Sequence, residues 1–418
     1  MRIYDYIFLF ATFFIWFLLF MNIILTYQGY RFYLYMNSKK IEILKELNTF
    51  PTVSILIPAH NEDIVIKKTV LSMLEMDYPK DRYEVVVIND NSTDNTESIV
   101  ISLIEKYKTS NLRIVNVPKG SIGSGKSNTL NYGLKTSNSE YIAVYDADNT
   151  PNKFALRYLM HEMLSNNNYG AVIGKFRTRN KNKNILTKFI NLETLTFQWM
   201  AQAGRWKLLK LCTIPGTNFL IRKNILDKLN GWDTKAIAED TEISFRIYSL
   251  GYKISFMPLA ETYEQEPETL KVWFKQRTRW VEGNIYVLRK YILLMLKSKN
   301  KNVFFDIIYF FSVYITFLTA VILSDILFLL LLIFKIKLFI TYNFILFWIL
   351  SFIVFILQVS LALSFEKGEN YSKNILLILL MYFTYCQMWV LVSIKGTFKS
   401  LKNIIFRKES KWYKTERF

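Results

Sequence analysis

Long apolar stretches lie toward both ends of this chain, and a segment of ordinary polarity separates them. Tyr6 to Tyr30 contains no charged residue, and it is longer than the ~20 residues that a helix needs to cross the core of a bilayer. It is also longer than the apolar region of a signal peptide, and no small-residue cleavage site follows it. We therefore predict a retained transmembrane helix within residues 1–32.

Further apolar blocks at 303–334, 338–365 and 375–394 predict three or four transmembrane helices within 302–395. Lys and Arg gather after the first helix and in the tail 396–418, which favours the cytoplasmic side for both flanks and for the domain between them. A cytoplasmic tail requires an even number of crossings after that domain. Either the first block turns back near Ser324-Asp325, or one block does not cross fully. We expect a multi-pass protein of the plasma membrane.

Between the membrane segments, residues 33–266 alternate short apolar runs with amphipathic stretches, which is typical of one sizeable α/β domain. Such alternation predicts a doubly wound parallel sheet, with ligands beyond the carboxyl ends of the strands. The predicted strands are 53–58, 83–90, 112–117 and 141–146, and the predicted helices between them are 63–76, 93–106 and 126–136.

The formal net charge is +19. Nucleic-acid binding is one explanation, but basic cytoplasmic segments of a membrane protein explain it more simply, and we expect no nucleic acid. Cys212 and Cys386 fall in the domain and in a membrane segment, so we expect no disulfide. His161-Glu162 lacks the second His of a zinc-protease motif, and no Cys/His cluster suggests another metal site.

Carboxylates follow two of the predicted strands. Asp90 could accept hydrogen bonds from a base or ribose, while Ser92 or Asp94 caps the next helix. Asp146-Ala147-Asp148 could hold a divalent cation, because Mg²⁺ takes one or two carboxylates together with phosphate oxygens. A solvated loop is the alternative for this short acidic pair.

Residues 120–127 match the pattern GxxxxGK[ST] between a predicted strand and a predicted helix, as a phosphate-binding loop of an NTPase would. An NTPase has no evident use for the membrane block or for the motif near it. In either reading, Lys126 at a helix N-terminus suits diphosphate binding.

Two motifs occur later in the chain. Glu239-Asp240 precedes an amphipathic stretch and could supply a general base, or it could be acid favoured by a helix dipole. Residues 267–301 predict interfacial amphipathic helices carrying Gln276-Arg277-Thr278-Arg279-Trp280. Spacing of i, i+3 and i+4 places Gln276, Arg279 and Trp280 on one face. Arg277 could lie on the solvated face, and it is assigned no role.

In this order, Asp90, Asp146-Ala147-Asp148, Glu239-Asp240 and Gln276 to Trp280 resemble the family 2 processive glycosyltransferases, which include cellulose, chitin, hyaluronan and poly-N-acetylglucosamine synthases. Pro58-Ala59-His60-Asn61-Glu62 is similar to the nucleotide-binding start of the family, with His60 in place of the usual Tyr. Gly125 to Asn131 is similar to its GKxxALN element, which weakens the NTPase reading. Ala238-Glu239-Asp240 lacks only the Thr of the usual TED.

The resemblance implies a GT-A-like mixed sheet inserted between transmembrane helices, and it implies roles for particular residues. Asp240 would be the catalytic base. The remaining roles are nucleotide and donor binding by His60, Glu62, Asp90, Lys126, Asp146 and Asp148; a Mg²⁺ or Mn²⁺ ion on Asp148; diphosphate and acceptor binding by Glu239, Gln276, Arg279 and Trp280; and gating by a tail segment with Trp412, Thr415 and Arg417.

The function implied is a processive, inverting membrane transferase. It would polymerise a UDP-sugar, with UDP-N-acetylglucosamine preferred, into an extracellular biofilm polysaccharide and pass the polymer across the bilayer. A small accessory membrane subunit is a further expected partner. The alternatives are a synthase of the cellulose or hyaluronan kind that uses another UDP-sugar, a non-processive transferase to a lipid carrier, and a membrane NTPase.

Overall fold

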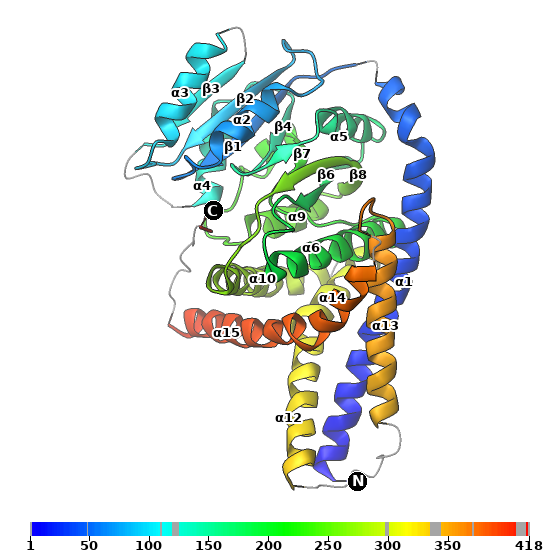
Figure 1. Ribbon diagram of the computed structural model, residues 1–418. Coiled ribbons are helices and arrows are strands. Elements are labelled where there is room, and N and C mark those ends of the chain that lie inside the picture. The colour runs from blue at the N-terminus through cyan, green and yellow to red at the C-terminus, as the bar shows by residue number, and fades with distance from the viewer. Residues whose placement is uncertain are drawn as a thin grey trace.

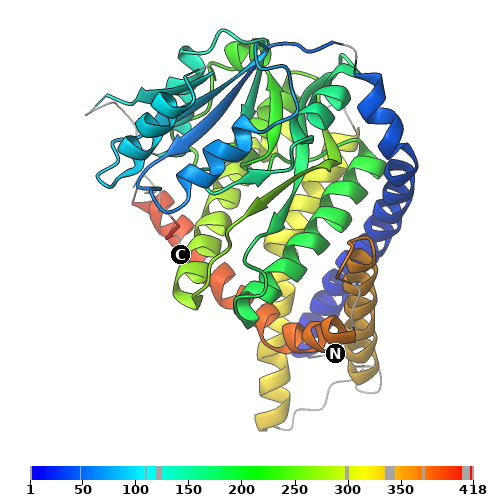
Figure 2. The same ribbon diagram turned by 45° about the horizontal axis from the view of Figure 1, so that its top comes forward.

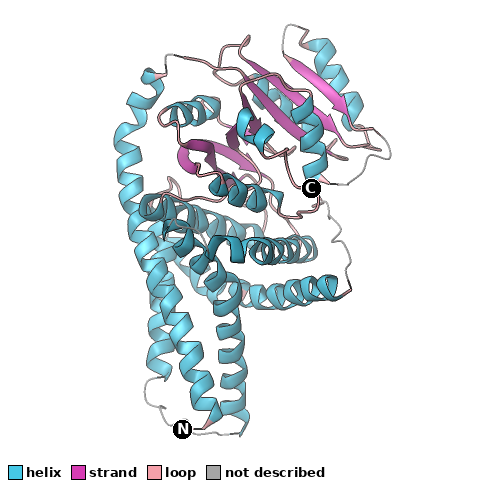
Figure 3. Cartoon of the chain, turned by 180° about the vertical axis from the view of Figure 1, so that it is seen from behind, coloured by secondary structure: helices cyan, strands magenta, loops and turns pink. Residues whose placement is uncertain are grey.

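The computed structural model describes residues 2–47, 49–108, 111–118, 125–296, 301–334, 344–369, 372–406 and 415–416. An α/β domain forms one end of the molecule, and long helices extend from it toward the N-terminus at the other end (Figure 1). All strands lie in the domain, and the extension is helical (Figure 3).

An eight-stranded mixed sheet forms the centre of the domain, in the order β3-β2-β1-β4-β7-β6-β8-β5. The strands β1 to β4 pair in parallel, whereas β7 pairs antiparallel with both β4 and β6. The strands are β1 (Val53–Ala59), β2 (Tyr83–Asn89), β3 (Leu112–Asn116), β4 (Tyr141–Val144), β5 (Thr150–Pro151), β6 (Tyr169–Thr178), β7 (Phe219–Arg222) and β8 (Lys253–Glu264).

The parallel half of the sheet confirms the four predicted strands. The three predicted helices between them are confirmed by α2 (Ile66–Leu74), α3 (Thr96–Lys106) and α4 (Lys126–Lys135). Strands β1 and β2 are buried along most of their length, because helices cover both faces of a parallel sheet. A purely parallel sheet was too simple a prediction. The antiparallel β7 makes the sheet mixed, as the family resemblance implies.

The helices of the domain and of the extension are α1 (Ile3–Glu46), α2 (Ile66–Leu74), α3 (Thr96–Lys106), α4 (Lys126–Lys135), α5 (Ala155–Leu164), α6 (Ile185–Thr196), η1 (Phe197–Ala203), α7 (Gly204–Leu209), α8 (Lys223–Lys228), α9 (Glu239–Ser249), α10 (Leu270–Leu296), α11 (Lys301–Phe311), η2 (Ser312–Phe317), α12 (Leu318–Phe334), α13 (Phe344–Ser364), α14 (Ser372–Phe383) and α15 (Tyr385–Ile405).

Helix α1 continues well past the predicted membrane segment and runs along the side of the domain (Figures 1 and 2). It crosses the η1–α7 helix at close range. A Cβ atom on Gly29 would lie 2.1 Å from the Trp199 carbonyl oxygen, and one on Gly204 would lie 2.3 Å from the Leu25 carbonyl oxygen. Only glycine permits this approach, which fixes the first helix against the domain.

The C-terminal helices leave the domain and return to it. Helix α12 passes through Ser324-Asp325 without a turn, so the chain does not reverse there. The segment after α13 docks on β6, where Lys175 Nζ lies 2.5 Å from Glu366 Oε1 and Trp199 Nε1 donates to the same oxygen at 2.7 Å. This contact places the end of α13 against the domain. Figure 1 shows the end of α12 and the start of α13 far from the domain.

Helix α15 lies along the domain and contacts it near both of its ends. Tyr385 donates to Glu193 of α6 at 2.6 Å, and Asn403 donates to Glu282 of α10 at 2.7 Å. Figures 1 and 3 show α15 running across the direction of α12 and α13. Its outward face is a stripe of exposed apolar side chains, consisting of Leu391, Ile394, Phe398, Leu401 and Ile405.

Within the described residues, three helices are long and apolar enough to cross a membrane: Ile3–Lys40, Val303–Leu330 and Asn374–Ile405. The last of these comprises α14 and α15 with the bend between them. Its hydropathy reflects the apolar stripe as well as buried packing against the domain. Ile349–Ser364, within α13, is a shorter apolar helix.

Candidate active site

The ammonium group of Lys126 is the centre of a charged cluster at the carboxyl edge of the sheet. Lys126 begins α4, and its Nζ lies 2.5 Å from Asp146 Oδ1 after β4 and 3.6 Å from Glu239 Oε1 at the start of α9. It also donates to the Gly216 carbonyl oxygen at 2.6 Å. One side chain thus joins two of the acidic motifs that the sequence singles out.

Asp240, the predicted base, lies beside this cluster. The Thr241 N–H donates to Asp240 Oδ1 at 2.6 Å. Gly216 has φ +89°, and a Cβ atom there would lie 2.9 Å from Asp240 Oδ2. Glycine is needed at position 216, both for its backbone conformation and for the space that the carboxylate occupies.

Burial raises the pKa of Glu239 to about 7 and also raises that of Asp240, while the charge of Lys126 lowers the pKa of both groups. Arg279 of α10 lowers both pKa values as well, so it lies within electrostatic reach of the pair. Burial lowers the pKa of Lys126, but Asp146 and Glu239 raise it above its usual value. Carboxyl groups tuned by burial and by a nearby cation are typical of catalytic sites.

The Asp146-Ala147-Asp148 segment is held by backbone and hydroxyl contacts. Thr217 Oγ1 accepts from the Asp146 N–H at 3.1 Å. Asp148 is 3% exposed, and its Oδ2 accepts from the Gln265 N–H at 3.0 Å. No cluster of three or more His, Cys, Asp or Glu side chains suitable for a metal occurs within the described ranges. One carboxylate still fits Mg²⁺ or Mn²⁺ carried with a diphosphate, which supplies most of the oxygen ligands.

The expected nucleotide end contains His60 and Asp90 in direct contact. His60 Nδ1 donates to the Asp90 carbonyl oxygen at 2.6 Å, and Thr129 Oγ1 donates to Asp90 Oδ2 at 3.1 Å. Glu62 is buried close by in the chain. The Thr96 N–H donates to Asp94 at 3.0 Å. Asp94 therefore serves the start of the helix, which leaves Asp90 for another role.

On α10, the interpretation of Arg277 as solvated is wrong. Arg277 is 1% exposed, and it forms an ion pair with Glu193 at 3.1 Å. Gln276 and Arg279 are half-buried, and Trp280 is 41% exposed. Helical spacing groups Gln276 with Trp280, but it does not reveal that Glu193 of α6 and Glu266 pair with Arg277.

Parts of two predicted elements lie outside the described residues. Of the glycine-rich match, 120–124 is not described, whereas Gly125 and Lys126 are. Of the tail segment, Trp412 and Arg417 lie outside the described part of the chain. Thr415 is described and is 8% exposed, so it is packed rather than free in solvent.

The loop before β7 contributes contacts that the sequence analysis missed. Gly216 accepts from Lys126, and Thr217 accepts from Asp146. The sequence Pro215-Gly216-Thr217-Asn218 is typical of a turn. That pattern identifies a loop, but it does not show that the loop touches the Lys126 cluster.

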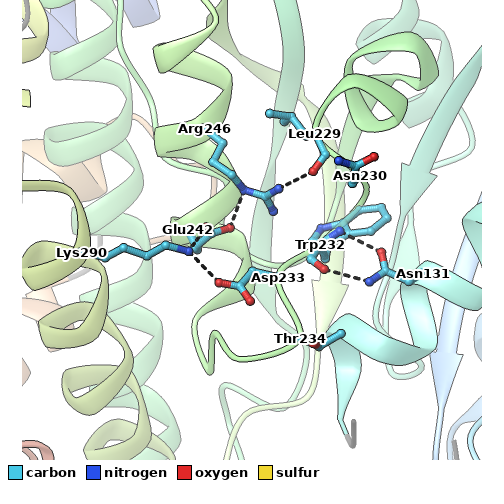
Figure 4. Close-up of a pocket in the computed structure, with 9 residues that line it drawn as sticks. All are labelled: Asn131, Leu229, Asn230, Trp232, Asp233, Thr234, Glu242, Arg246 and Lys290. Carbon is cyan, nitrogen blue, oxygen red and sulfur yellow. Dashed lines mark hydrogen bonds and ion pairs between the residues drawn. The ribbon is translucent and has the colours of Figure 1, made fainter. Parts of the chain in front are cut away.

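A polar cavity of about 410 Å³ lies next to α9 (Figure 4). Glu242 is buried there and accepts from Arg246 at 2.8 Å and from Lys290 of α10 at 2.9 Å. Residues two apart on a helix do not share a face, so Glu242 points away from Asp240. These ion pairs brace α9 against α10 and fix the helix start that carries Asp240. The lining is Asn131, Leu229, Asn230, Trp232, Asp233, Thr234, Glu242, Arg246 and Lys290.

This mixed sheet, with carboxylates after β4 and at the start of α9, defines a GT-A-like glycosyltransferase. Residues 51–283 match the family model described as "Glycosyltransferase like family 2", and the chain belongs to that family. It is a glycosyltransferase that carries a hexosyltransferase domain.

Known relatives agree with this family. The chain is 47% identical over 404 residues to "Probable glycosyltransferase YdaM" of Bacillus subtilis (strain 168), covering 97% of this chain and 96% of that protein. It is 31% identical over 252 residues to a poly-beta-1,6-N-acetyl-D-glucosamine synthase of Staphylococcus epidermidis, covering 60% of this chain and 59% of that protein.

A solved structure shares the fold. It is the mannosyltransferase PcManGT from Pyrobaculum calidifontis in complex with GDP-Man and Mn²⁺, with a TM-score of 0.61 and 21% identity. The match covers 92% of this chain and 99% of that chain.

Proposed function

We propose that this glycosyltransferase is a processive, inverting membrane enzyme that polymerises a UDP-sugar, with UDP-N-acetylglucosamine as the preferred donor. The observation that carries the proposal is the cluster in which Lys126 joins Asp146 and Glu239 beside Asp240, within reach of Arg279. The similarity to poly-beta-1,6-N-acetyl-D-glucosamine synthases supports the choice of donor.

The donor would lie along the carboxyl edge of the sheet. His60, Glu62 and Asp90 would hold the uridine, with the ring of His60 oriented by its bond to the Asp90 carbonyl. Lys126 would exchange part of its contact with Asp146 for the diphosphate, because a lysine at a helix N-terminus suits an anion. Asp146 would then be available to the nucleotide sugar.

Transfer would proceed by a single displacement. Asp240 takes the proton of the acceptor hydroxyl, the acceptor oxygen bonds to the anomeric carbon, and the bond from that carbon to the UDP oxygen breaks. Lys126 and Arg279 stabilise the negative charge that develops on UDP. A Mg²⁺ or Mn²⁺ ion held by Asp148 would neutralise further diphosphate charge when bound.

The acceptor would approach from α10, where Gln276 and the exposed Trp280 lie on the helix that also carries Arg279. Aromatic side chains that keep one face exposed offer an apolar surface together with a polar edge. Thr415, which is packed against the protein, belongs to the segment proposed to gate the site.

We further propose that the catalytic domain is cytoplasmic, that α1, α11–α12 and α13 cross the plasma membrane, and that α15 lies at the membrane surface. The end of α12 and the start of α13 lie far from the domain, whereas the end of α13 lies against it (Figure 1). Helix α15 contacts the domain near both of its ends. These positions support the proposed arrangement. Two crossings after the domain then satisfy the even number that a cytoplasmic tail requires.

The variant Asp240→Asn tests the proposed base. The amide keeps the shape of the carboxylate but does not accept the proton, so incorporation from radiolabelled UDP-N-acetylglucosamine should fall by about 10²–10⁴-fold, the range for losing a general base. The affinity for UDP with MnCl₂ should change little. Full incorporation by the variant would remove Asp240 from the mechanism.

Transfer of one sugar to a lipid carrier is the second candidate. Few long helices leave the domain in the described part of the chain. This favours the second candidate, because transfer to a lipid-linked acceptor requires no polymer channel through the membrane. The same acceptor face on α10 would serve it. The size of the product distinguishes the two functions.

A further inference from the structure

Arg277 is the most deeply buried member of the Gln276–Trp280 motif, and it contacts more than one part of the site. Its Nη2 lies 3.1 Å from Glu193 Oε2 and 3.8 Å from Glu266 Oε2. Burial lowers the pKa of Arg277, but Glu193 and other neighbours raise it above its usual value. A fixed cation therefore lies between two carboxylates from different segments.

The same guanidinium holds both side chains that flank it on the proposed acceptor face. Nη1 donates to Gln276 Oε1 at 2.6 Å, and Cζ lies 3.8 Å from the centre of the Trp280 ring. An arginine stacked on an indole orients the ring as well as attracting it. The positions of Gln276 and Trp280 therefore depend on Arg277.

A second line of contacts leads from Arg277 toward Asp148. Glu266 is buried beside Arg277, and the preceding residue, Gln265, donates its N–H to Asp148 Oδ2 at 3.0 Å. The backbone at Glu266 is fixed further by a pair of bonds with Asn180, each 2.9 Å long. Displacing Glu266 would move the donor that holds the Asp148 carboxylate.

A third line of contacts leads to α15. Glu193 Oε2 also accepts from Tyr385 at 2.6 Å, and Tyr385 in turn accepts from Trp273 Nε1 at 2.9 Å. Arg277 thus joins α6, α10 and the start of α15 through one carboxylate.

We propose that Arg277 is a positioning residue of the transfer reaction, a role that rests on the proposed function. Arg277 sets the positions of Gln276 and Trp280 on the acceptor side relative to Asp148 on the donor side. It does so without touching the Lys126 cluster. The rate of transfer depends on the relative position of acceptor and donor, because displacing a reacting group by about 1 Å can lower the rate about 10²-fold.

Lysine does not substitute for arginine in this role. The planar guanidinium offers separate Nη groups to Gln276 and to the carboxylates while its face covers Trp280, whereas an ammonium group is a single point of contact. Arg277→Lys therefore keeps the buried charge, but it removes the second N–H donor group and the stacking on Trp280.

The test uses the full chain in detergent, with radiolabelled UDP-N-acetylglucosamine for turnover and with UDP plus MnCl₂ for calorimetric binding. In Arg277→Lys, kcat should fall by about 10–100-fold, as expected for lost positioning of Gln276 and Trp280. The Kd of UDP should stay within about twofold of the wild type, because the lysine keeps the charge that pairs with Glu266 and so leaves the N–H donor to Asp148 in place. Lys271→Met, an exposed lysine on the same helix, is the matched control and should behave as the wild type.

Glu193→Gln provides a second variant if Arg277→Lys does not fold. It leaves Arg277 in place and weakens only one of its anchors, so we expect a smaller loss of kcat with unchanged UDP affinity. An unchanged kcat in the folded variants would overturn the proposal, and so would a loss of UDP affinity that matches the loss of kcat. No incorporation by the wild-type protein from any UDP-sugar would overturn the proposed function and this role with it.

Discussion

Lys126 controls the charge balance of the site at the scale of single residues. Its ammonium group faces Asp146, Glu239 and Asp240, and it opposes the rise in the pKa values of the last two that burial causes. The base must be deprotonated to accept a proton. In the proposed mechanism, the lysine would contribute to catalysis before any diphosphate binds, because its charge opposes the rise in the pKa of Asp240 that burial causes.

We expect Lys126→Met to move the acidic limb of the pH–rate profile to higher pH. Removing the cation leaves burial unopposed, so the pKa of the Glu239–Asp240 pair rises further and more alkaline medium is needed to deprotonate the base. Initial rates of sugar incorporation across pH 5–9 would measure the limb. Lys135→Met, at the exposed end of the same helix, should leave it in place. A limb at the same pH in both variants would contradict this role of Lys126.

At the scale of elements, α15 combines a buried face with an apolar exposed face. Lys399 lies 2.8 Å from Glu282 of α10 and anchors one side of the helix, while Leu391, Phe398 and Ile405 project from another. An amphipathic helix with lysines beside its apolar stripe is suited to the boundary between lipid head groups and acyl chains. Hydropathy averaged along the helix does not distinguish this arrangement from a crossing.

Cysteine labelling with a membrane-impermeant maleimide tests this arrangement. In a Cys212→Ser/Cys386→Ser background, Lys399→Cys and Lys367→Cys should be labelled from the same side as Lys67→Cys, a position in the domain. Phe334→Cys, at the far end of α12, should be labelled from the opposite side. If positions 367 and 399 were labelled from opposite sides, α14–α15 would cross the membrane and the proposed topology would be wrong.

At the scale of the whole molecule, the sequence identified the half of the sheet that has a simple pattern. Strands β1 to β4 are apolar runs between helical stretches, so their burial on both faces can be predicted from the sequence. Strands β5 and β7 are very short. Strand β8 contains Pro258 and several polar residues. Their pairing depends on partners distant in the chain, which no local pattern reports.

The site was predictable to a similar extent. Motif residues such as Asp146 and Glu239 come together because strand and helix ends meet at one edge of the sheet. The contribution of Gly216 depends on a backbone angle and on the nearness of Asp240, and neither is visible in a turn sequence. Arg277 was misplaced because helical spacing defines faces without showing which neighbour covers each one.

Processive synthesis is tested by the size of the product that the purified full-length protein forms from radiolabelled UDP-N-acetylglucosamine, followed from the first turnovers. We expect long, hydrolase-sensitive polysaccharide from the earliest time points with few short intermediates, and no polysaccharide from Asp240→Asn. A product that carries a single sugar and partitions with lipid into organic solvent would contradict processive synthesis.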